Sequence, residues 1–417
     1  MGEEKDCLQH IQLLIDVKNM IRDYFPEEGE LSGEYLGIWE QLRVIVGEVN
    51  AYYFKSEEIA FNALSACLDG AYSECGKTKL ISALEEWLAF IKETVQRRST
   101  YANAMDRVFY EYMDRARYVA YDVLLQQVID ALYQNDPLDV GHLEYFYEHF
   151  HGFWGMLNIK NDNYEVIESR VKALKEHWQD FIWTYERLSD YRSKFVLFKF
   201  IEYWFTYNRH ETVDKMREYA FKDYYDLDLL HCDENEVIAD LGAYIGDSIL
   251  DYANVYGEYK KAFCFEVSPW NVAEIEKNLK DFHDITIIPK AAGDKKGMLS
   301  MTISPEPDSC NSTEIEYGFE TEVEMTTVDE EIKEPLTLIK MDIEGAEQSA
   351  LLGCKEHILK DYPKLLICVY HNNEDIWKIP KMIYEIRDDY DFYLRSNGDQ
   401  WGPSEIVLFA LPRTKGM

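Results

Sequence analysis

Positive charge is scarce in this sequence. Its 417 residues include 43 Lys and Arg against 78 Asp and Glu, which gives a formal net charge of -35 at pH 7. Proteins that bind nucleic acid neutralise phosphates with Lys and Arg gathered on one surface, and a field this acidic repels them. The composition therefore disfavours a nucleic-acid partner and an anionic membrane surface, and it is typical of a highly soluble protein.

The sequence also lacks a long apolar run and a CxxC cysteine pair. Its most apolar segment, residues 195–207, is too short to span a bilayer and includes Lys199 and Glu202. The first ten residues, MGEEKDCLQH, do not have the charged-then-apolar pattern of a secretory signal. None of the eight cysteines has a paired spacing, and Cys264 and Cys368 lie in apolar runs, where a thiol acts as a small hydrophobe. We therefore expect a cytoplasmic protein with reduced cysteines and no membrane insertion.

The apolar pattern predicts two domains with a boundary near residue 210. Up to that point the periodicity is helical almost throughout, and the clearest stripe runs from Tyr164 to Leu188 in steps of three and four. It predicts one long helix, packed inside a helical bundle or, alternatively, in a coiled coil between subunits. Asp136-Pro137 is a helix start signal. We assign residues 1–210 to an all-helical domain and residues 211–417 to a second domain.

In the second domain short apolar runs alternate with helical segments, which predicts a mainly parallel seven-stranded sheet with right-handed crossovers. Two extra strands, near 298–304 and 321–328, predict an inserted hairpin, and the segment 305–319 between them is a candidate lid. The expected main strands lie near 237–241, 262–267, 285–290, 336–341, 364–370, 391–395 and 405–410.

No GxGxxG segment, the mark of a dinucleotide-binding loop, follows the first expected strand. Residues 236–246 instead read EVIADLGAYIG, in which an apolar run ends at Asp240 and is followed by Gly242 and Gly246. The glycines permit a tight turn and allow a ligand to approach main-chain N–H groups. Asp240 and Asp247 suit a positively charged ligand such as S-adenosylmethionine better than a pyrophosphate. The loop therefore favours a methyltransferase over a dehydrogenase, which would bind nicotinamide cofactors.

Four motifs follow one another in this half: DLGAYIGDS at 240–248, FEVSP at 265–269, AAGD at 291–294 and IKMDIEGAE at 339–347. Together they resemble, in that order, the FkbM family of S-adenosylmethionine-dependent methyltransferases. The resemblance covers about residues 212–411, because VYHNNEDIWKIP, YLRSNG and EIVLFA in the tail are also similar to that family. It implies a Rossmann-like class I fold, S-adenosyl-L-methionine as cofactor, S-adenosyl-L-homocysteine as product, and O-methylation of a saccharide or natural-product hydroxyl.

We place the cofactor at the carboxyl ends of the strands, where open α/β sheets bind their ligands. Glu266, at the end of the second strand, is assigned to the ribose hydroxyls. Asp240 and the glycine loop should face the methionine end, and the resemblance places Ala291 and Ala292 beside the adenine. The predicted cofactor-binding residues are Asp240, Gly242, Ala243, Tyr244, Gly246, Asp247, Ser248, Glu266, Val267, Ala291, Ala292 and Asp342.

Three residues are candidates for catalysis. Asp342 ends the fourth main strand, near the expected position of the methyl group, and Glu344 follows it in a helix-start segment where acidic residues also complement the helix dipole. His371 follows another strand and is the candidate general base, since an unperturbed imidazole titrates near neutrality. These three side chains also suit a divalent metal, but their spacing does not show such a site, and we predict none.

The leading hypothesis is an S-adenosylmethionine-dependent O-methyltransferase of a small molecule or glycan. The alternative is a cofactor-binding scaffold with a methyltransferase-like domain and no turnover. Nothing in residues 1–210 identifies the acceptor, so the sequence leaves open whether the helical half selects a large acceptor, forms a homodimer or docks a partner.

Overall fold

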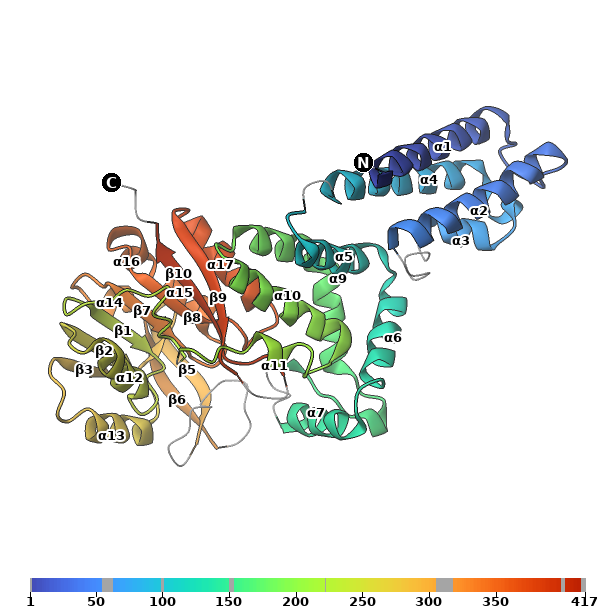
Figure 1. The fold of residues 1–417 in the computed structure, drawn as a ribbon. Coiled ribbons are helices and arrows are strands. Elements are labelled where there is room, and N and C mark those ends of the chain that lie inside the picture. Colours follow the sequence, from blue (N-terminus) through green and yellow to red (C-terminus); the bar gives the residue numbers. More distant parts are fainter. Residues whose placement is uncertain are drawn as a thin grey trace. The chain divides into compact units, whose positions relative to one another are not determined.

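The computed structural model describes residues 2–54, 63–98, 101–149, 154–221, 223–304, 318–398 and 402–413. Most of the candidate lid, residues 305–317, lies outside these ranges. The described chain forms two compact units, Met1–Gln127 and Val128–Met417 (Figure 1). No helix in the described ranges is long and apolar enough to cross a membrane.

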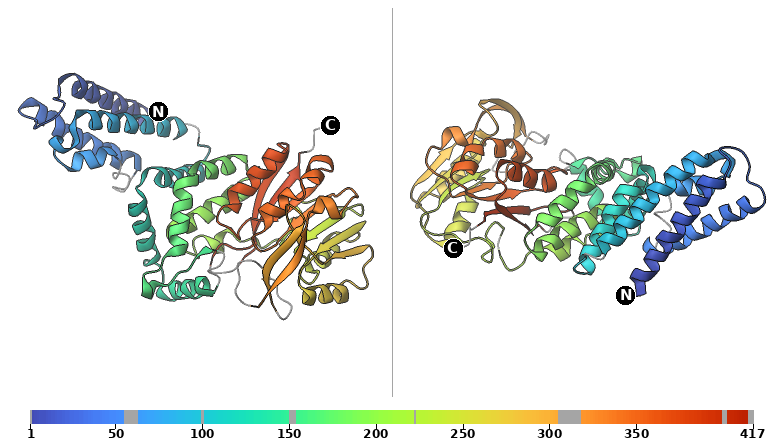
Figure 2. Two further views of the ribbon diagram at one scale, coloured as in Figure 1. Left: turned by 180° about the vertical axis from the view of Figure 1, so that it is seen from behind. Right: turned by 90° about the horizontal axis from the view of Figure 1, so that it is seen from above.

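The N-terminal half is helical, as predicted. In Met1–Gln127, α1 lies alongside α4 (Figures 1 and 2), and Leu14, Ile21 and Trp87 are among the side chains buried there. The helices before the sheet are α1 Gly2–Tyr24, α2 Glu34–Phe54, α3 Ala63–Asp69, α4 Tyr72–Arg98, α5 Ala104–Tyr118, α6 Tyr121–Leu132, α7 Pro137–His149, the short 3-10 helix η2 Ile159–Asn161, α9 Glu165–Arg187, α10 Tyr191–Thr206 and α11 Val213–Met216.

One expectation about the cysteines is wrong. Cys67 at the end of α3 and Cys75 at the start of α4 form a disulfide, with their Cα atoms 5.2 Å apart. No paired spacing was visible in the sequence because the two helices fold back on each other only in the tertiary structure. Cys232, Cys264, Cys354 and Cys368 are free thiols.

The boundary between compact units falls at 127/128, whereas the sequence predicted a domain boundary near 210. Helices α9 and α10 belong to the second unit because they pack on its sheet edge and on α17 (Figure 2). The side chain of Asp190 accepts a hydrogen bond from the Ser193 N–H and so caps α10. Arg395 of β9 then donates to Asp190 at 2.8 Å and to Asp226 at 2.6 Å, and is itself almost fully buried. A helix whose cap is tied to the sheet cannot form a separate core.

The long helix predicted from Tyr164 to Leu188 is α9. Its apolar stripe, including Val171, Leu174 and Phe181, is buried within the chain, as expected for packing inside a helical bundle. Helix α7 begins at Pro137 with Asp136 accepting from the Leu138 N–H, as the start signal predicted.

The predicted seven-stranded sheet with an inserted hairpin is confirmed. Its strand order is β3-β2-β1-β7-β8-β10-β9, in which β10 runs antiparallel to both neighbours and the other pairs are parallel. The hairpin forms a separate small sheet with a two-residue strand that the sequence did not predict, in the order β4-β6-β5. The strands are β1 Val237–Leu241, β2 Lys261–Phe265, β3 Ile285–Ile288, β4 Ala291–Ala292, β5 Gly297–Ile303, β6 Phe319–Thr326, β7 Leu338–Met341, β8 Lys364–Cys368, β9 Tyr390–Ser396 and β10 Ile406–Pro412.

Helices connect the parallel strands, and buried apolar side chains fill both the strands and the inner helix faces. The five residues of β1 are all buried, which explains why this run is continuously apolar up to its carboxylate. The connecting helices are α12 Asp247–Tyr256, α13 Pro269–Asn278, α14 Val328–Glu331, α15 Glu347–Leu352, α16 Lys355–Lys360 and α17 Asp375–Ile386.

Candidate active site

The predicted site residues converge at the carboxyl edge of the parallel strands. β1, β2 and β7 are neighbours, so Gly242, Glu266 and Asp342, which each follow one of these strands, meet at that edge. A pocket lies there. Its lining consists of Gly242, Phe265, Glu266, Val267, Lys290, Ala291, Ala292, Leu299, Met301, Asp342, Ile343, Glu344 and Ala346.

Half of the predicted cofactor residues line this pocket, and so do two of the three catalytic candidates, Asp342 and Glu344. The cofactor residues in the lining are Gly242, Glu266, Val267, Ala291, Ala292 and Asp342. The remaining predicted residues, which are outside the lining, are Asp240, Ala243, Tyr244, Gly246, Asp247, Ser248 and His371.

Glu266 is held firmly in the pocket wall. Its Oε1 accepts a hydrogen bond from the Ser268 N–H at 2.8 Å, and Asn271 and the N–H groups of Val267 and Tyr244 also donate to the carboxylate. Burial raises the pKa of Glu266, and these hydrogen bonds oppose that shift. The side chain is therefore oriented before any ligand arrives.

The glycine loop serves the packing of the strands. The N–H groups of Gly242 and Ala243 both donate to the Phe265 carbonyl, at 3.1 and 3.0 Å, and the Gly246 N–H donates to the Ala243 carbonyl at 2.7 Å. Gly242 has a φ of 80°, and a Cβ on it would overlap the main-chain oxygen of Asp342. The glycine is required because the β1 and β7 loops touch, whereas the sequence suggested ligand access to these N–H groups.

Asp240 also differs from expectation, because its carboxylate is turned into the sheet. It is fully buried, and its Oδ1 lies 3.1 Å from Nζ of Lys340 on the adjacent strand β7. Lys340 in turn donates to the Gly242 carbonyl at 2.8 Å. Burial raises the pKa of Asp240 to about 6, although Lys340 opposes the shift. Asp240 thus ties β1, β7 and the glycine loop together.

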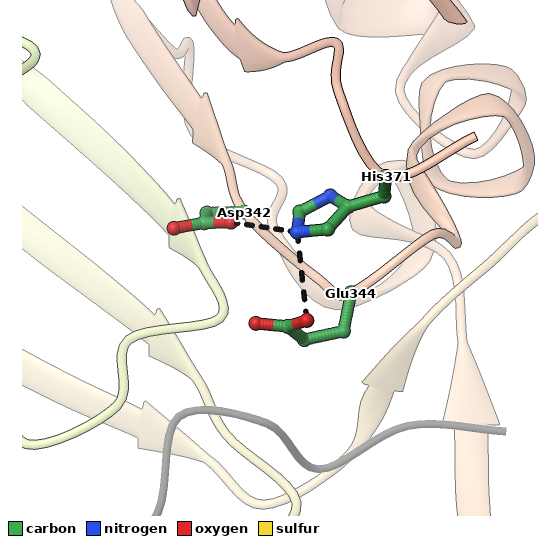
Figure 3. Close-up of side chains that lie close together, drawn as sticks. All are labelled: Asp342, Glu344 and His371. Carbon is green, nitrogen blue, oxygen red and sulfur yellow. Dashed lines mark ion pairs between the residues drawn. The ribbon is translucent and has the colours of Figure 1, made fainter. Parts of the chain in front are cut away.

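The three catalytic candidates come together in space (Figure 3). Nε2 of His371 lies 3.7 Å from Oδ1 of Asp342 and 3.5 Å from Oε2 of Glu344. One ligating atom from each residue lies within 4.8 Å of the other two. Asp342 and Glu344 follow β7, and His371 follows the neighbouring strand β8. Glu344 reaches this position through a left-handed backbone with a φ of 55°.

Two further side chains fix this cluster. Tyr224 Oη donates to Oδ2 of Asp342 at 2.7 Å, and Oε1 of Glu347 lies 2.9 Å from Nδ1 of His371. The same Glu347 oxygen accepts from the Ile343 N–H at 3.0 Å. Glu347 and His371 are both almost completely buried.

Burial and charged neighbours shift the pKa values of the three cluster residues. Burial lowers the pKa of His371, but Glu347 and Glu344 outweigh it and hold the pKa well above its usual value. This raised pKa favours the protonated imidazole, whereas the sequence suggested an unperturbed one. Burial raises the pKa of Glu344 to about 8, against the opposing charge of His371. For Asp342, Lys340 and His371 outweigh burial and lower the pKa.

Sequence reasoning missed several residues of this site. Lys340 was visible inside the motif IKMDIEGAE, where a lysine between apolar neighbours in a buried strand calls for a charged partner. Tyr224 gave no signal, because 118 residues separate it from Asp342. Leu299 and Met301 bring the inserted hairpin into the pocket wall, which the hairpin's apolar pattern alone did not indicate.

Comparison with known proteins agrees with this geometry. Residues 240–400 match the methyltransferase FkbM domain. Residues 240–400 are an FkbM methyltransferase domain. The match includes the glycine loop, Glu266 and the Asp342–Glu344–His371 cluster. No curated protein matches the sequence.

Solved structures of methyltransferases resemble the fold. The FkbM methyltransferase of Methylobacillus flagellatus KT has 24% identity and a TM-score of 0.49, over 58% of this chain and 61% of that one. An rRNA methylase from Streptococcus thermophilus has 14% identity and a TM-score of 0.30, over 43% and 88% of the two chains. Aeropyrum pernix fibrillarin, whose structure contains bound S-adenosyl-L-methionine, has 12% identity and a TM-score of 0.28, over 43% and 67%. The family assignment rests on the FkbM domain match.

Proposed function

We propose that this protein is an S-adenosylmethionine-dependent methyltransferase that methylates a hydroxyl group of a saccharide or natural product. The observation that carries the proposal is the pocket at the carboxyl edge of β1, β2 and β7, within an FkbM domain. The oriented carboxylate of Glu266 lines this pocket, and so do the carboxyl groups of Asp342 and Glu344.

The lining suits a nucleoside with a charged tail. Glu266 would accept hydrogen bonds from the two ribose hydroxyls, because its carboxylate lines the pocket and is already fixed by N–H donors. Val267, Ala291 and Ala292 offer an apolar, narrow space for a base. Asp342 and Glu344 lie in the part of the lining contributed by the β7 loop, where an ammonium or sulfonium would be favoured. S-adenosylmethionine, when bound, supplies an electrophilic methyl group.

The residues of this chain would then position the acceptor and assist the departure of its hydroxyl proton. An alcohol hydroxyl has a pKa far above 7, so its proton must leave as the oxygen attacks. We assign this task to the Asp342–Glu344–His371 cluster, because two of its three side chains line the pocket and the third contacts both of them.

The helical segment ahead of the sheet is proposed to shape the acceptor side. Within the second unit, Trp154 Nε1 donates to the Tyr370 carbonyl at 2.9 Å, and Asn373 donates to Ser169 Oγ at 3.2 Å. These contacts hold the segment against the loop that includes His371. Homodimer formation and partner docking are the alternatives for the remaining helices, and the net charge of -35 supports a partner other than nucleic acid.

Calorimetric titration with S-adenosylmethionine and with S-adenosylhomocysteine tests the proposal. We expect saturable binding of both at micromolar concentrations. Glu274→Gln is a suitable control, because Glu274 lies on α13 in an ion pair with Lys277, outside the pocket lining. Absence of binding to either compound would overturn the assignment.

Turnover separates the enzyme from the alternative, a cofactor-binding scaffold. Conversion of S-adenosylmethionine to S-adenosylhomocysteine on addition of a cell extract or a saccharide library supports the enzyme, and tight binding without conversion supports the scaffold. His371→Ala should slow turnover and leave cofactor affinity nearly unchanged, because His371 is outside the pocket lining. Unchanged turnover would make His371 a structural residue.

A further inference from the structure

The cluster at the ends of β7 and β8 has the geometry of a metal site. Oδ1 of Asp342, Oε2 of Glu344 and Nε2 of His371 lie within 4.8 Å of one another, and the two distances to Nε2 are 3.7 and 3.5 Å. Two ligands of one ion, each at about 2.1 Å, lie at most about 4.2 Å apart. The three atoms therefore surround a space that a divalent cation would fill after side-chain shifts of a few tenths of an ångström.

The surrounding residues hold each ligand in the orientation that a metal requires. Metal-binding histidines bind a carboxylate through their other ring nitrogen, which fixes the ring, and metal-binding carboxylates are themselves hydrogen-bonded. Both features are present, because Glu347 contacts Nδ1 of His371 at 2.9 Å and Tyr224 donates to Oδ2 of Asp342 at 2.7 Å. Nε2 and Oδ1 are thereby left facing each other and Glu344 (Figure 3).

One buried oxygen of the cluster lacks a hydrogen-bond donor in the described part of the chain. Oδ1 of Asp342 is inaccessible to solvent and accepts no hydrogen bond from the described part of the chain. A buried polar atom without a hydrogen bond costs free energy unless something else satisfies it. Nε2 of His371 is 3.7 Å from this oxygen, beyond hydrogen-bond distance.

The charges of the buried side chains around the cluster also favour a bound cation. Three carboxyl groups, Asp342, Glu344 and Glu347, surround the single imidazole of His371. Lys340, the buried lysine nearby, is already paired with Asp240 and the Gly242 carbonyl. Buried carboxylates are stable when they are paired or coordinate a metal, so an added cation would relieve this excess of negative charge.

We infer that Asp342, Glu344 and His371 bind a divalent metal ion of the Mg²⁺ or Mn²⁺ class. Two carboxylate oxygens and one imidazole nitrogen suit such an ion, and an octahedral ion keeps about three positions for other oxygens. This departs from the prediction of no metal that the sequence spacing had suggested.

The role of the ion rests on the proposed function. Its open positions would take one or two hydroxyl oxygens of the acceptor and lower their pKa, as a Lewis acid does. In the transfer, the hydroxyl O–H bond breaks and its proton passes to water. A new O–C bond forms to the donated methyl group, and the C–S bond breaks with its electron pair left on sulfur. The products are the methyl ether and S-adenosylhomocysteine, and no redox partner is needed.

Binding of Mn²⁺ alone tests the inference. The full-length protein, stripped with EDTA and then dialysed, is titrated with Mn²⁺ and followed by electron paramagnetic resonance and calorimetry, without cofactor. We expect one ion per chain. Glu344→Gln and Asp342→Asn should each weaken binding by at least 10-fold, and Tyr224→Phe by about 10- to 100-fold, as for loss of a residue that orients a ligand.

Asp375→Asn is the matched control. Asp375 is a fully buried carboxylate near the cluster, contributes no ligand atom, and bonds Gln348 and Asn372 instead. Its replacement should leave Mn²⁺ affinity within about threefold. An equal loss in Asp375→Asn and Glu344→Gln would overturn the site, because it would show a general response to charge.

Absence of stoichiometric Mn²⁺ binding by the folded wild type would also overturn it. Circular dichroism of each variant establishes folding, and Tyr224→Phe keeps the test decisive if the carboxylate variants do not fold. S-adenosylmethionine is titrated separately in EDTA. Cofactor binding without Mn²⁺ binding would refute the metal site and leave the methyltransferase intact, whereas Mn²⁺ binding without cofactor binding would refute the proposed function alone.

Discussion

Replacing Asp240 should destabilise the protein more than it affects cofactor binding. Asp240 and Lys340 are almost fully buried and 3.1 Å apart. At an effective dielectric constant of about 20, this separation corresponds to an attraction of about 5 kcal/mol. Removing one partner of such a pair leaves an uncompensated buried charge, which typically costs about 3–5 kcal/mol. We therefore expect Asp240→Asn to lower the free energy of unfolding by about 3–5 kcal/mol.

Urea unfolding followed by circular dichroism measures this loss. The double variant Asp240→Asn/Lys340→Met should recover at least half of it, because the unpaired ammonium is removed as well. Asp247→Asn is the control: Asp247 is a nearby carboxylate at the start of α12 but is exposed, so its replacement should change the free energy of unfolding by no more than about 0.5 kcal/mol.

Two results would refute this reasoning. If Asp240→Asn lowers the free energy of unfolding by less than about 1 kcal/mol, the buried pair contributes no more than an exposed ion pair does. A double variant no more stable than the single one would show that the lost free energy does not come from an unpaired Lys340.

Three further predictions concern the cofactor wall, the loop and the sheet edge. Glu266→Gln should weaken S-adenosylmethionine binding by about 1.5–3 kcal/mol, roughly 10- to 150-fold by calorimetry, and an unchanged affinity would remove Glu266 from the site. Gly242→Ala should lower the melting temperature far more than Gly33→Ala. Both glycines have positive φ, but a Cβ collides with main chain only at position 242, and similar melting temperatures would contradict this. Burial raises the pKa of Asp190, but hydrogen bonds from Arg395 and Ser193 outweigh it and lower the pKa. The pKa of Asp190 is lower in the folded state than in the unfolded state, where it is near 3.8. The ionised Asp190 therefore stabilises the fold fully above pH 3.8, and this stabilisation is lost as the pH falls below that value. The stability difference between wild type and Asp190→Asn, measured by urea unfolding from pH 6 to pH 3, should therefore shrink on acidification, and a constant difference would contradict the pairing.

Features that depend on neighbouring residues were predictable from the sequence. The stripe from Tyr164 to Leu188 predicted α9, because residues three and four apart share one helix face. Each main strand appeared as a short apolar run, and the chain order of strands and helices predicted a parallel sheet. Glu266 lines the pocket, at the edge where the strand ends of such a sheet were expected to meet.

Features that depend on distant residues were not predictable. The disulfide between Cys67 and Cys75 depends on how two helices fold back on each other. The pKa of His371 is raised by Glu347 and Glu344, which belong to another helix and loop. The boundary at 127/128 follows from the docking of α10 on β9, which the helical pattern of residues 1–210 does not encode.

The sequence by itself determined the helical first half, the Rossmann-like second half and the resemblance to FkbM methyltransferases, because periodicity and motif order are local properties. Only the tertiary structure decided that Asp240 faces Lys340, that Tyr224 holds Asp342, and that Asp342 and Glu344 meet His371. The physical reason is the register of the sheet. Pairing β1 with β7 and β7 with β8 brings residues about 30 to 100 positions apart within a few ångströms, and burial then fixes their charges.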